Sequence, residues 1–418
     1  MFCPKCGEKN PDGARFCARC GAAIAAAGPV SGPVPAPPRR RSRVPLVAAC
    51  AVAAVAVVVA AVLVLPGLLG GGRAAQERQA SNAALNGGYK NTVVSSGDYD
   101  YLYSASVGGI CRVKSDGSSA ELIRPIDSAP YHVSALAIDG DTLYFALEGN
   151  APSEIRSIQL DGTNEKSLVT LATEPNESAT LTSEPNEFNQ RVAQICVYDG
   201  ALYVTSYVYD PYEMTCTWNV YTVHKDGSDI RQVFTLDGDY LAIQDLLVLP
   251  DAVYYLENGN GGDFYTLNAW DSDTNQVRAL YTGTSAYASE LCMVDGQLIF
   301  IERGSGSQQV MCFGTDGQEQ KTLWSGEGAM IATVADGSVY LSVPNSDGSE
   351  GRSLLRVPLD GSAEQTVAQN LLNTSHSVSD VGGRLVVCEN ATETDDTSVL
   401  QAISMNYDGT DQVTYPLG

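Results

Sequence analysis

The stretch that decides the fold is Ala137-Ile138-Asp139-Gly140-Asp141-Thr142-Leu143-Tyr144-Phe145, in which two short apolar runs flank an Asp-Gly pair. Apolar runs of this length are typical of β-strands, and Asp-Gly between two of them favours a tight, primed hairpin turn. The pattern recurs further along the chain, in copies that begin at Val197, Met293 and Val334. The sequence therefore predicts a repeated β-hairpin.

A second hairpin pattern alternates with the first, as in Ile110–Gly117, where an alternating strand ends in Asp-Gly. Its turns fall at Asp116, Asp161, Asp226, Asp271, Asp316, Asp360 and Asp408, spaced by 44 to 48 residues apart from one interval of 65. The long interval holds a near-duplicated segment (173–177 and 183–187), and the fourth copy has Asp271-Ser272-Asp273 in place of Asp-Gly. Four strands per repeat of about 45 residues is the period of a β-propeller blade. Seven copies predict an all-β propeller of seven blades over residues 91–418, and six blades is the alternative if a terminal copy is partial.

Residues 90–418 resemble a bacterial domain of unknown function related to the low-density-lipoprotein-receptor type of propeller. The resemblance rests on the Asp-Gly-x-Leu-Tyr strand pair and on the Asp-Gly hairpin. It implies a propeller that binds a ligand. The chain departs from the receptor propellers in two ways, because it lacks their Tyr-Trp-Thr-Asp tetrapeptide and has seven repeats instead of six.

Four cysteines near the N-terminus form two Cys-x-x-Cys pairs, each followed by glycine: Cys3 with Cys6, and Cys17 with Cys20. Two such pairs can place four thiolates around one Zn²⁺, and four protein ligands make a zinc site structural. The alternatives are two disulfides or a redox pair. Residues 2–24 resemble the short zinc-ribbon module at the N-terminus of many bacterial membrane proteins, which implies zinc binding. We expect Zn²⁺ to supply the folding energy of residues 1–24, because so short a module buries little apolar surface.

A transmembrane helix is predicted for residues 44–69, because no residue from 44 to 72 is charged and Leu46–Leu65 is uninterruptedly apolar. Twenty apolar residues at about 1.5 Å each span roughly 30 Å of hydrocarbon. A Pro/Arg-rich linker (25–43) precedes the span and a short stalk (70–90) follows it. The linker contains Arg39, Arg40, Arg41 and Arg43. These arginines predict a single-pass cell-membrane protein with a cytoplasmic N-terminus and an extracellular C-terminal domain.

Charge divides the chain in the same place. The whole chain has 49 acidic and 25 basic residues, for a net charge of −24. Residues 1–44 have a net charge of +6 and residues 71–418 a net charge of −30. A nucleic-acid partner is therefore excluded for the propeller, since phosphates would meet a repelling field.

The Asp-Gly turns are expected on one face of the propeller and the longer connections on the other. These connections comprise Glu148–Glu154, Tyr207–Trp218, Glu257–Asp263, Pro344–Arg352 and Glu389–Asp396. Insertions and binding sites concentrate together in repeat proteins. The candidate ligand-binding residues are Tyr207, Tyr209, Tyr212 and Trp218, and the alternative is that these loops only keep the protein soluble.

Other residues that could carry chemistry are scattered. His132 and His376 are each expected just before an innermost strand, and His224 on a third strand. Asp271, Asp273 and Asn275 are spaced like the start of a calcium loop, without its later ligands. The remaining propeller cysteines are expected to be buried free thiols: Cys111, Cys196, Cys216, Cys292, Cys312 and Cys388.

The functional expectation is a non-enzymatic module that binds or senses an extracellular protein, peptide or glycan. No catalytic motif of the nucleophile-elbow, metalloprotease, P-loop or dinucleotide type is present in the sequence. The main alternative is a propeller hydrolase or lyase acting on glycans or peptides, with catalytic residues drawn from several blades. A third possibility is a scaffold that only spaces or presents other components.

Overall fold

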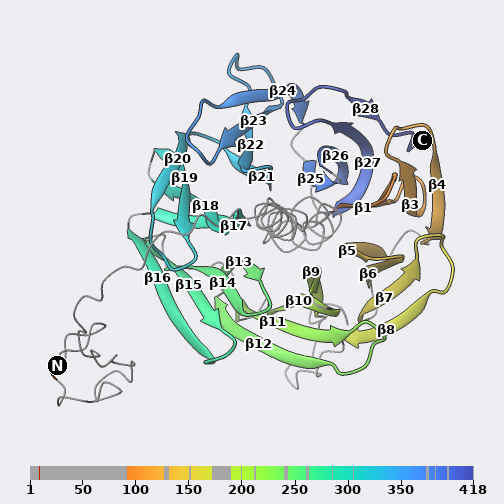
Figure 1. Cartoon of the computed structure of the whole chain (residues 1–418), viewed down its shortest axis with the longest axis horizontal. Coiled ribbons are helices and arrows are strands. Elements are labelled where there is room, and N and C mark those ends of the chain that lie inside the picture. Colours follow the sequence, from red (N-terminus) through yellow and green to blue (C-terminus); the bar gives the residue numbers. More distant parts are fainter. Residues whose placement is uncertain are drawn as a thin grey trace, which may run out of the picture. The chain divides into compact units, whose positions relative to one another are not determined.

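A computed structural model describes Lys9 and residues 92–417, apart from 127–130, 150, 151, 172–189, 199, 211, 212, 240–242, 260–262, 285, 305, 373–375, 382, 393 and 394. The described residues form seven four-stranded antiparallel sheets, each built from four consecutive strands. The sheets stand around a central axis as the blades of a propeller (Figure 1). The prediction of seven blades is confirmed. In the described part of the chain no helix is long and apolar enough to cross a membrane, and the predicted span 44–69 lies outside that part.

Within each blade, chain order runs from the axis outwards. The innermost strands are β1 (Val93–Ser96), β5 (His132–Asp139), β9 (Arg191–Tyr198), β13 (Ile243–Val248), β17 (Ala286–Val294), β21 (Met330–Ala335) and β25 (His376–Val381). The second strands are β2 (Tyr99–Ser104), β6 (Thr142–Glu148), β10 (Ala201–Asp210), β14 (Ala252–Asn258), β18 (Gln297–Gly304), β22 (Ser338–Pro344) and β26 (Arg384–Thr392). The third strands are β3 (Gly109–Lys114), β7 (Ser153–Gln159), β11 (Thr215–His224), β15 (Phe264–Asp271), β19 (Ser307–Gly314), β23 (Arg352–Pro358) and β27 (Asp395–Met405). The outermost strands are β4 (Ala120–Pro125), β8 (Lys166–Leu171), β12 (Arg231–Asp239), β16 (Gln276–Thr284), β20 (Lys321–Gly326), β24 (Gln365–Leu372) and β28 (Val413–Thr414).

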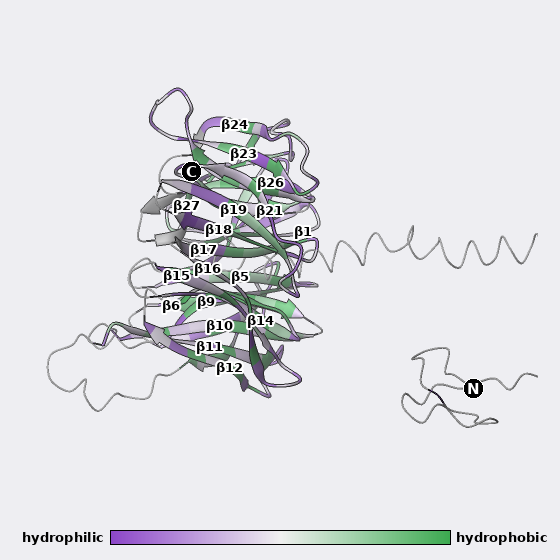
Figure 2. Cartoon of the chain, turned by 90° about the vertical axis from the view of Figure 1, so that its left-hand side faces the viewer, coloured by the Kyte–Doolittle hydropathy of each residue, from purple (hydrophilic) through white to green (hydrophobic). Residues whose placement is uncertain are grey.

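Because successive strands are antiparallel, their connections fall on two opposite faces, and the strands run between these faces in the edge-on view (Figure 2). The turns from first to second strand and from third to fourth strand share one face, which we term the turn face. The connections from second to third strand and from blade to blade share the other, which we term the loop face. The predicted division into two faces is confirmed by this strand order.

The two kinds of Asp-Gly turn differ in geometry. In the first kind, Asp295 and Gly296 both have positive φ, at 49° and 72°, as a two-residue primed hairpin requires. The second kind is wider than predicted: the backbone N–H of Lys114 bonds to the carbonyl of Ser119, and Asp116 Oδ1 accepts a bond from the N–H of Ser118 at 2.9 Å. The aspartate side chain accepts a hydrogen bond from the backbone of the turn and so stabilises it. The turn has four residues, whereas a two-residue turn was predicted.

The glycine of the wider turn makes a close contact with the backbone of the preceding blade. In β4, Ile123 is a bulge residue that the pairing with β3 skips. A methyl group added at Gly162 of the next blade would lie 2.5 Å from the Ile123 carbonyl oxygen, so only glycine fits. Gly227, Gly317 and Gly409 approach the bulges of their preceding blades in the same way.

The core lies between the blades. Each interface between neighbouring blades holds its own cluster of buried aliphatic and aromatic side chains. Between the fourth and fifth blades, for example, the stacked rings of Phe300 and Phe313 have centroids 5.5 Å apart, and Tyr265 meets Phe300 edge-on. Each Å² of apolar surface buried at an interface contributes about 25 cal/mol to stability. The stability of each blade therefore depends on its two neighbours.

The ring closes between the first and last blades without any exchange of strands, since β1–β4 and β25–β28 are each continuous in sequence. Asp100 on β2 is completely buried and forms an ion pair of 2.6 Å with Arg384 on β26. Tyr415 donates its hydroxyl to the same carboxylate, and Ser104 Oγ donates to the Val399 carbonyl at 2.6 Å. Hydrogen bonds, an ion pair and an apolar cluster thus hold the first and last blades together, in place of a sheet shared between the two ends of the chain.

Candidate functional site

The predicted ligand-binding residues lie in an elongated third blade. The strands β10, β11 and β12 have ten, ten and nine residues, and β10 continues for three residues past Tyr207, the partner of the first residue of β9. The segment Tyr207–Trp218, expected to be a loop, is therefore mostly paired strand with a short turn. This expectation was wrong because the cross-strand pairs between β10 and β11 extend as far as Asp210 and Thr215.

Tyr207 and Trp218 are directly opposite each other on β10 and β11, with ring centroids 5.1 Å apart. Trp218 and Leu236 pack against the cluster between the third and fourth blades, so this aromatic pair is partly buried. Tyr209 lies further along β10 and donates its hydroxyl to the sulfur of Met214 at 3.1 Å. Tyr212 lies outside the described residues, and the recognition role of the set stays a prediction.

Four large apolar side chains are exposed on the loop face, one from each of the second to fifth blades. Met214 at the end of the β10–β11 hairpin is 50% exposed, and Phe264 at the start of β15 is 46% exposed. Tyr131, just before β5, and Tyr287, near the start of β17, are 38% and 47% exposed. We term these four residues the exposed arc. None of the four was among the residues predicted from the sequence. The feature that could have identified them is a large apolar residue at the end of a strand, on the face where the loops are long.

Acidic side chains accompany the exposed arc in the third and fourth blades. They are Asp210, Glu213, Asp237, Asp239, Glu257 and Asp263, and all but Asp210 are exposed. Arg191, the first residue of β9, is exposed on the same face and forms no ion pair within the described part of the chain. The field of this sector is therefore negative.

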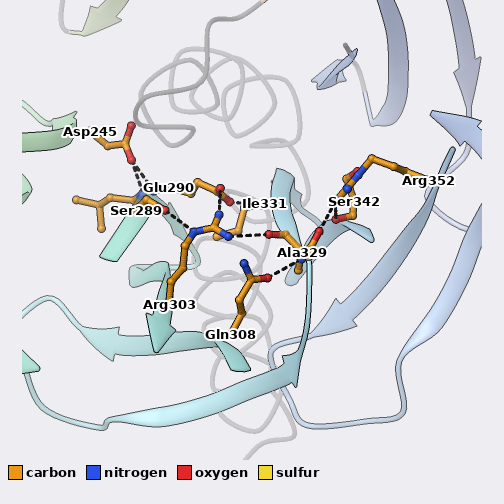
Figure 3. Close-up of polar contacts among 11 residues, drawn as sticks. Asp245, Ser289, Glu290, Arg303, Gln308, Ala329, Ile331, Ser342 and Arg352 are labelled. Atoms are coloured by element: carbon orange, nitrogen blue, oxygen red, sulfur yellow. Dashed lines mark hydrogen bonds and ion pairs between the residues drawn. The ribbon is translucent and has the colours of Figure 1, made fainter. Parts of the chain in front are cut away.

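A second group of polar side chains lies nearer the axis, on the inner strands of the fourth to sixth blades (Figure 3). Asp245 on β13 and Glu290 on β17 occupy bulges and have left-handed backbones, with φ of 50° and 66°. Such a conformation is unfavourable for residues other than glycine, so both positions are held by their contacts. Asp245 accepts a bond of 2.5 Å from the backbone N–H of Glu290, and Glu290 accepts one of 2.5 Å from the N–H of Ile331.

These carboxylates link each inner strand to the next. Glu290 also forms an ion pair with Arg303, which donates to Ser289 and to the Ala329 carbonyl (Figure 3). Burial raises the pKa of Asp245 to about 6. Burial likewise raises the pKa of Glu290 to about 7 against the attraction of Arg303, and the nearby Asp245 adds to the rise. Asp245 and Glu290 have a structural role, because their carboxylate oxygens accept hydrogen bonds from backbone N–H groups of the next blade.

Glu148, at the end of β6, has the same role between the second and third blades. It is 5% exposed and accepts a bond of 2.5 Å from the backbone N–H of Val192. The imidazole of His132 lies 3.5 Å from its other oxygen. Burial alone would raise the pKa of Glu148, but the hydrogen bonds from His132 and Val192 outweigh burial and lower it. The result is an ionised carboxylate beside a partly exposed histidine on the loop face.

The other candidates from the sequence have structural positions. His132 and His376 are the first residues of inner strands, one position further along than the prediction that they precede them. His224 ends the third strand β11, as predicted, and is exposed with Nδ1 2.7 Å from Asp226. Asp271 caps its own turn through Thr274, and Asn275 accepts a bond from the Trp270 indole, so the spacing typical of a calcium loop builds a turn. All six described cysteines are buried free thiols, as predicted.

Within the described residues, no group of three or more histidine, cysteine, aspartate or glutamate side chains could hold a metal ion. Cys3, Cys6, Cys17 and Cys20 lie outside those residues. Their donor set, four thiolates in two Cys-x-x-Cys pairs, fits Zn²⁺ and leaves no position open for catalysis.

Comparison with known proteins supports both modules. The model of the zinc-ribbon domain matches residues 2–24. The chain is a seven-bladed β-propeller with an N-terminal zinc-ribbon domain. No curated protein matches the sequence significantly.

Several solved structures share the propeller fold. A puromycin hydrolase, solved as its S511A mutant complexed with PGG, has a TM-score of 0.53 and 14% identity; the match covers 81% of this chain and 55% of that one. The propeller domain of the Trilobed protease from Pyrococcus furiosus, described as having an open velcro topology, has a TM-score of 0.50 and 13% identity, with 79% and 98% covered. An oligogalacturonate lyase in complex with manganese has a TM-score of 0.50 and 10% identity, with 79% and 89% covered. The chain spans about half the length of the puromycin hydrolase, and at these identities the likeness concerns the fold alone.

Proposed function

We propose that this chain is a single-pass membrane protein whose propeller, outside the cell, binds a protein, peptide or glycan through its loop face. The zinc ribbon lies in the cytoplasm in this proposal, with one structural Zn²⁺ bound by Cys3, Cys6, Cys17 and Cys20. The uncharged run from 44 to 72 and the four arginines before it support the topology.

The observation that carries the binding proposal is the exposed arc: Tyr131, Met214, Phe264 and Tyr287. Exposed large apolar residues that gather on one face, surrounded by polar residues, are typical of interaction surfaces. Aromatic residues offer a large contact area and lose little rotamer entropy on binding, so they often act as anchors. Of the other exposed large apolar residues of the propeller, four lie on outermost strands or just before one (Leu122, Ile230, Val233 and Val277), and Leu400 lies on the third strand β27.

The test compares two sets of substitutions in the full chain on peptide and glycan arrays. One variant carries Tyr131→Ser, Phe264→Ser and Tyr287→Ser. The matched control carries Leu122→Ser, Ile230→Ser and Val277→Ser, which remove exposed apolar side chains from elsewhere on the propeller. Truncating an anchor residue costs about 2 kcal/mol or more, so the loop-face variant should bind at least about thirtyfold more weakly. Equal binding by the two variants would refute the proposal.

The alternative function is a hydrolase or lyase, and the His132–Glu148 pair favours it. An imidazole oriented by a buried, ionised carboxylate can act as a general base. His132→Gln should abolish turnover of glycan or peptide substrates in this case and leave the binding on arrays unchanged. Absence of turnover by the wild type would refute this alternative, and retained turnover in His132→Gln would refute the role of His132 as its general base.

A further inference from the structure

Two carboxylates meet between the inner strands of the fourth and fifth blades (Figure 3). Asp245 Oδ2 accepts hydrogen bonds from two successive backbone N–H groups of β17, that of Glu290 at 2.5 Å and that of Leu291 at 3.3 Å. Glu290 uses both of its oxygens, because one accepts from the N–H of Ile331 and the other from Arg303. Asp245 Oδ2 is thus the acceptor through which β13 holds this part of β17.

Among the described residues, one cation accompanies the two carboxylates at ion-pair distance. It is Arg303 of β18, which pairs with Glu290. Arg352 of β23 attracts Glu290 from further away, without forming an ion pair with any described residue. Cys292 of β17 is also near both acids, but burial raises the pKa of its thiol well above the ordinary value, so it stays neutral. Asp245 therefore has no cation to balance its charge within this part of the chain.

The other acidic side chains on the strands that pack against β13 and β17 have partners elsewhere. Glu257 of β14 accepts a hydrogen bond from Asn268, Glu302 of β18 accepts one from Tyr265, Asp210 of β10 accepts one from the N–H of Glu213, and Asp271 of β15 accepts one from Thr274. The basic side chain of β16, Arg278, donates to the Asp316 carbonyl, and β21 contains no ionisable residue.

The second oxygen of Asp245 can hold a proton. Within the described part of the chain, Oδ1 takes part in no hydrogen bond, so the carboxyl can be protonated there and still accept both N–H bonds with Oδ2. Ionisation would place a second negative charge near Glu290 in a poorly solvated site, which is unfavourable. Burial accordingly raises the pKa of Asp245 to about 6, although the two N–H groups act to lower it.

The backbone is strained at both carboxylates. Asp245 and Glu290 are bulge residues with φ of 50° and 66°, in the left-handed region. Residues other than glycine keep such a conformation only where their contacts hold it. Weakening the contact between the two residues therefore favours release of the bulge in β17.

We propose that Asp245 and the bulge at Glu290 form a pH-sensitive hinge between the fourth and fifth blades, closed when Asp245 holds a proton and loosened when it is ionised. Loosening would reach the loop face, because Tyr287 of the exposed arc lies on β17 directly opposite Arg303. The hinge requires no ligand, so it stands apart from the proposed function.

Hydrogen–deuterium exchange of the full chain, followed by mass spectrometry at pH 5.0 and pH 8.0, tests the hinge. Protection factors, which correct for the base-catalysed exchange of free amides, are compared between peptides that cover β13 and β17 and peptides that cover β5 and β6 of the second blade. The test variant is Asp245→Asn, because asparagine keeps an oxygen acceptor, cannot ionise and tolerates the left-handed backbone. The matched control is Glu148→Gln, which changes the carboxylate that links the second and third blades.

Rising pH should favour opening, because the closed hinge binds the proton of Asp245 more tightly than the open one. A carboxyl with a pKa of about 6 in the closed state and 3.8 in the open state lowers the protection about tenfold between pH 5.0 and 8.0. Glu290, whose pKa is also raised, adds to this fall. In the wild type, the protection of β13 and β17 should therefore fall at least about tenfold, while that of β5 and β6 stays constant.

The two variants should differ. In Asp245→Asn the fall in β13 and β17 should be about tenfold smaller than in the wild type, whereas Glu148→Gln should show the full fall. Equal protection at both pH values in the wild type would overturn the hinge. An undiminished fall in Asp245→Asn would also overturn it, because another group would then be titrating. A fall of the same size in β5 and β6 would overturn it as well, since the whole propeller would then loosen. None of these results bears on binding at the loop face, which the arrays test separately.

Discussion

Arg384→Met should open the ring at the interface of the first and last blades. Arg384 donates to Asp100 at 2.6 Å, to Ser404 at 2.5 Å and to Tyr415 at 2.8 Å. The substitution keeps the apolar stem of the side chain and removes the charge. Asp100 would then be a buried carboxylate whose remaining bond comes from the Tyr415 hydroxyl.

The size of the effect follows from burial. The side chains of Asp100 and Arg384 are 0% and 18% exposed. Removing one partner of a buried ion pair costs about 3–5 kcal/mol, because the other charge stays in a poorly solvated site. Burial acts to lower the pKa of Arg384, but the hydrogen bonds and the attraction of Asp100 outweigh it and raise this pKa, so the guanidinium is charged.

Urea unfolding of the full chain, followed by tryptophan fluorescence, measures this cost. The chain has three tryptophans, Trp218, Trp270 and Trp324, and they lie in the third, fourth and fifth blades, away from the closure. A loss of about 3–5 kcal/mol in unfolding free energy at these probes would mean that closure stabilises the whole ring. The double variant Arg384→Met with Asp100→Asn removes both charges and should regain at least half of the loss.

An unchanged tryptophan midpoint in Arg384→Met would refute the reasoning, because the distant blades would then be stable without the closure. A double variant no more stable than the single one would refute the electrostatic part, and would assign the loss to packing around the arginine stem.

Three further outcomes are expected. Asp245 has a folded-state pKa of about 6 against an ordinary 3.8, so the folded chain keeps a proton that the unfolded chain releases, and the unfolding free energy should fall as pH rises from about 4 to 6. Glu290, whose pKa is raised to about 7, adds to this slope, so Asp245→Asn should make the slope shallower without removing it and should raise stability at pH 7.5 by about 1–3 kcal/mol. Urea unfolding across pH measures both effects, and an unchanged slope would contradict the prediction. Cys17→Ser should abolish binding of one zinc per chain, measured by atomic absorption, while Cys50→Ser keeps the zinc and neither variant changes the melting of the propeller; zinc retained in Cys17→Ser would contradict the site. Protease added to intact cells should remove the propeller and spare an N-terminal tag; loss of the tag would reverse the topology, and secretion of a shortened chain would identify the span as a cleaved signal.

The repeat and its turn face could be predicted because they depend on local sequence. Strand alternation and an Asp-Gly pair fix a hairpin whatever lies beside it, so Asp295-Gly296 sufficed to place a turn. The exposed arc could not be predicted in this way. Trp218 and Phe264 are both aromatic and near loops, yet Trp218 packs against the fourth blade while Phe264 is 46% exposed. Which of them is covered depends on the neighbouring blade, whose sequence lies dozens of residues away.

The degenerate fourth repeat illustrates the same limit. Its turn (272–275) contains no glycine, unlike the other wide turns, and it is held by Asp271 and Asn275 through side-chain hydrogen bonds. In the second, third, fifth and seventh blades the turn glycine approaches the bulge of the preceding outermost strand.

Val233 is the bulge residue of β12, the outermost strand just before the degenerate repeat. It is 37% exposed, whereas Ile123 and Val367 are 9% and 7% exposed and the other two counterparts, Leu168 and Leu280, are partly buried. The repeat that lacks the turn glycine thus follows a blade whose bulge residue is more exposed. A sequence pattern can mark a repeat as irregular, but the consequence depends on a contact between repeats, and only the assembled ring determines which residues that contact joins.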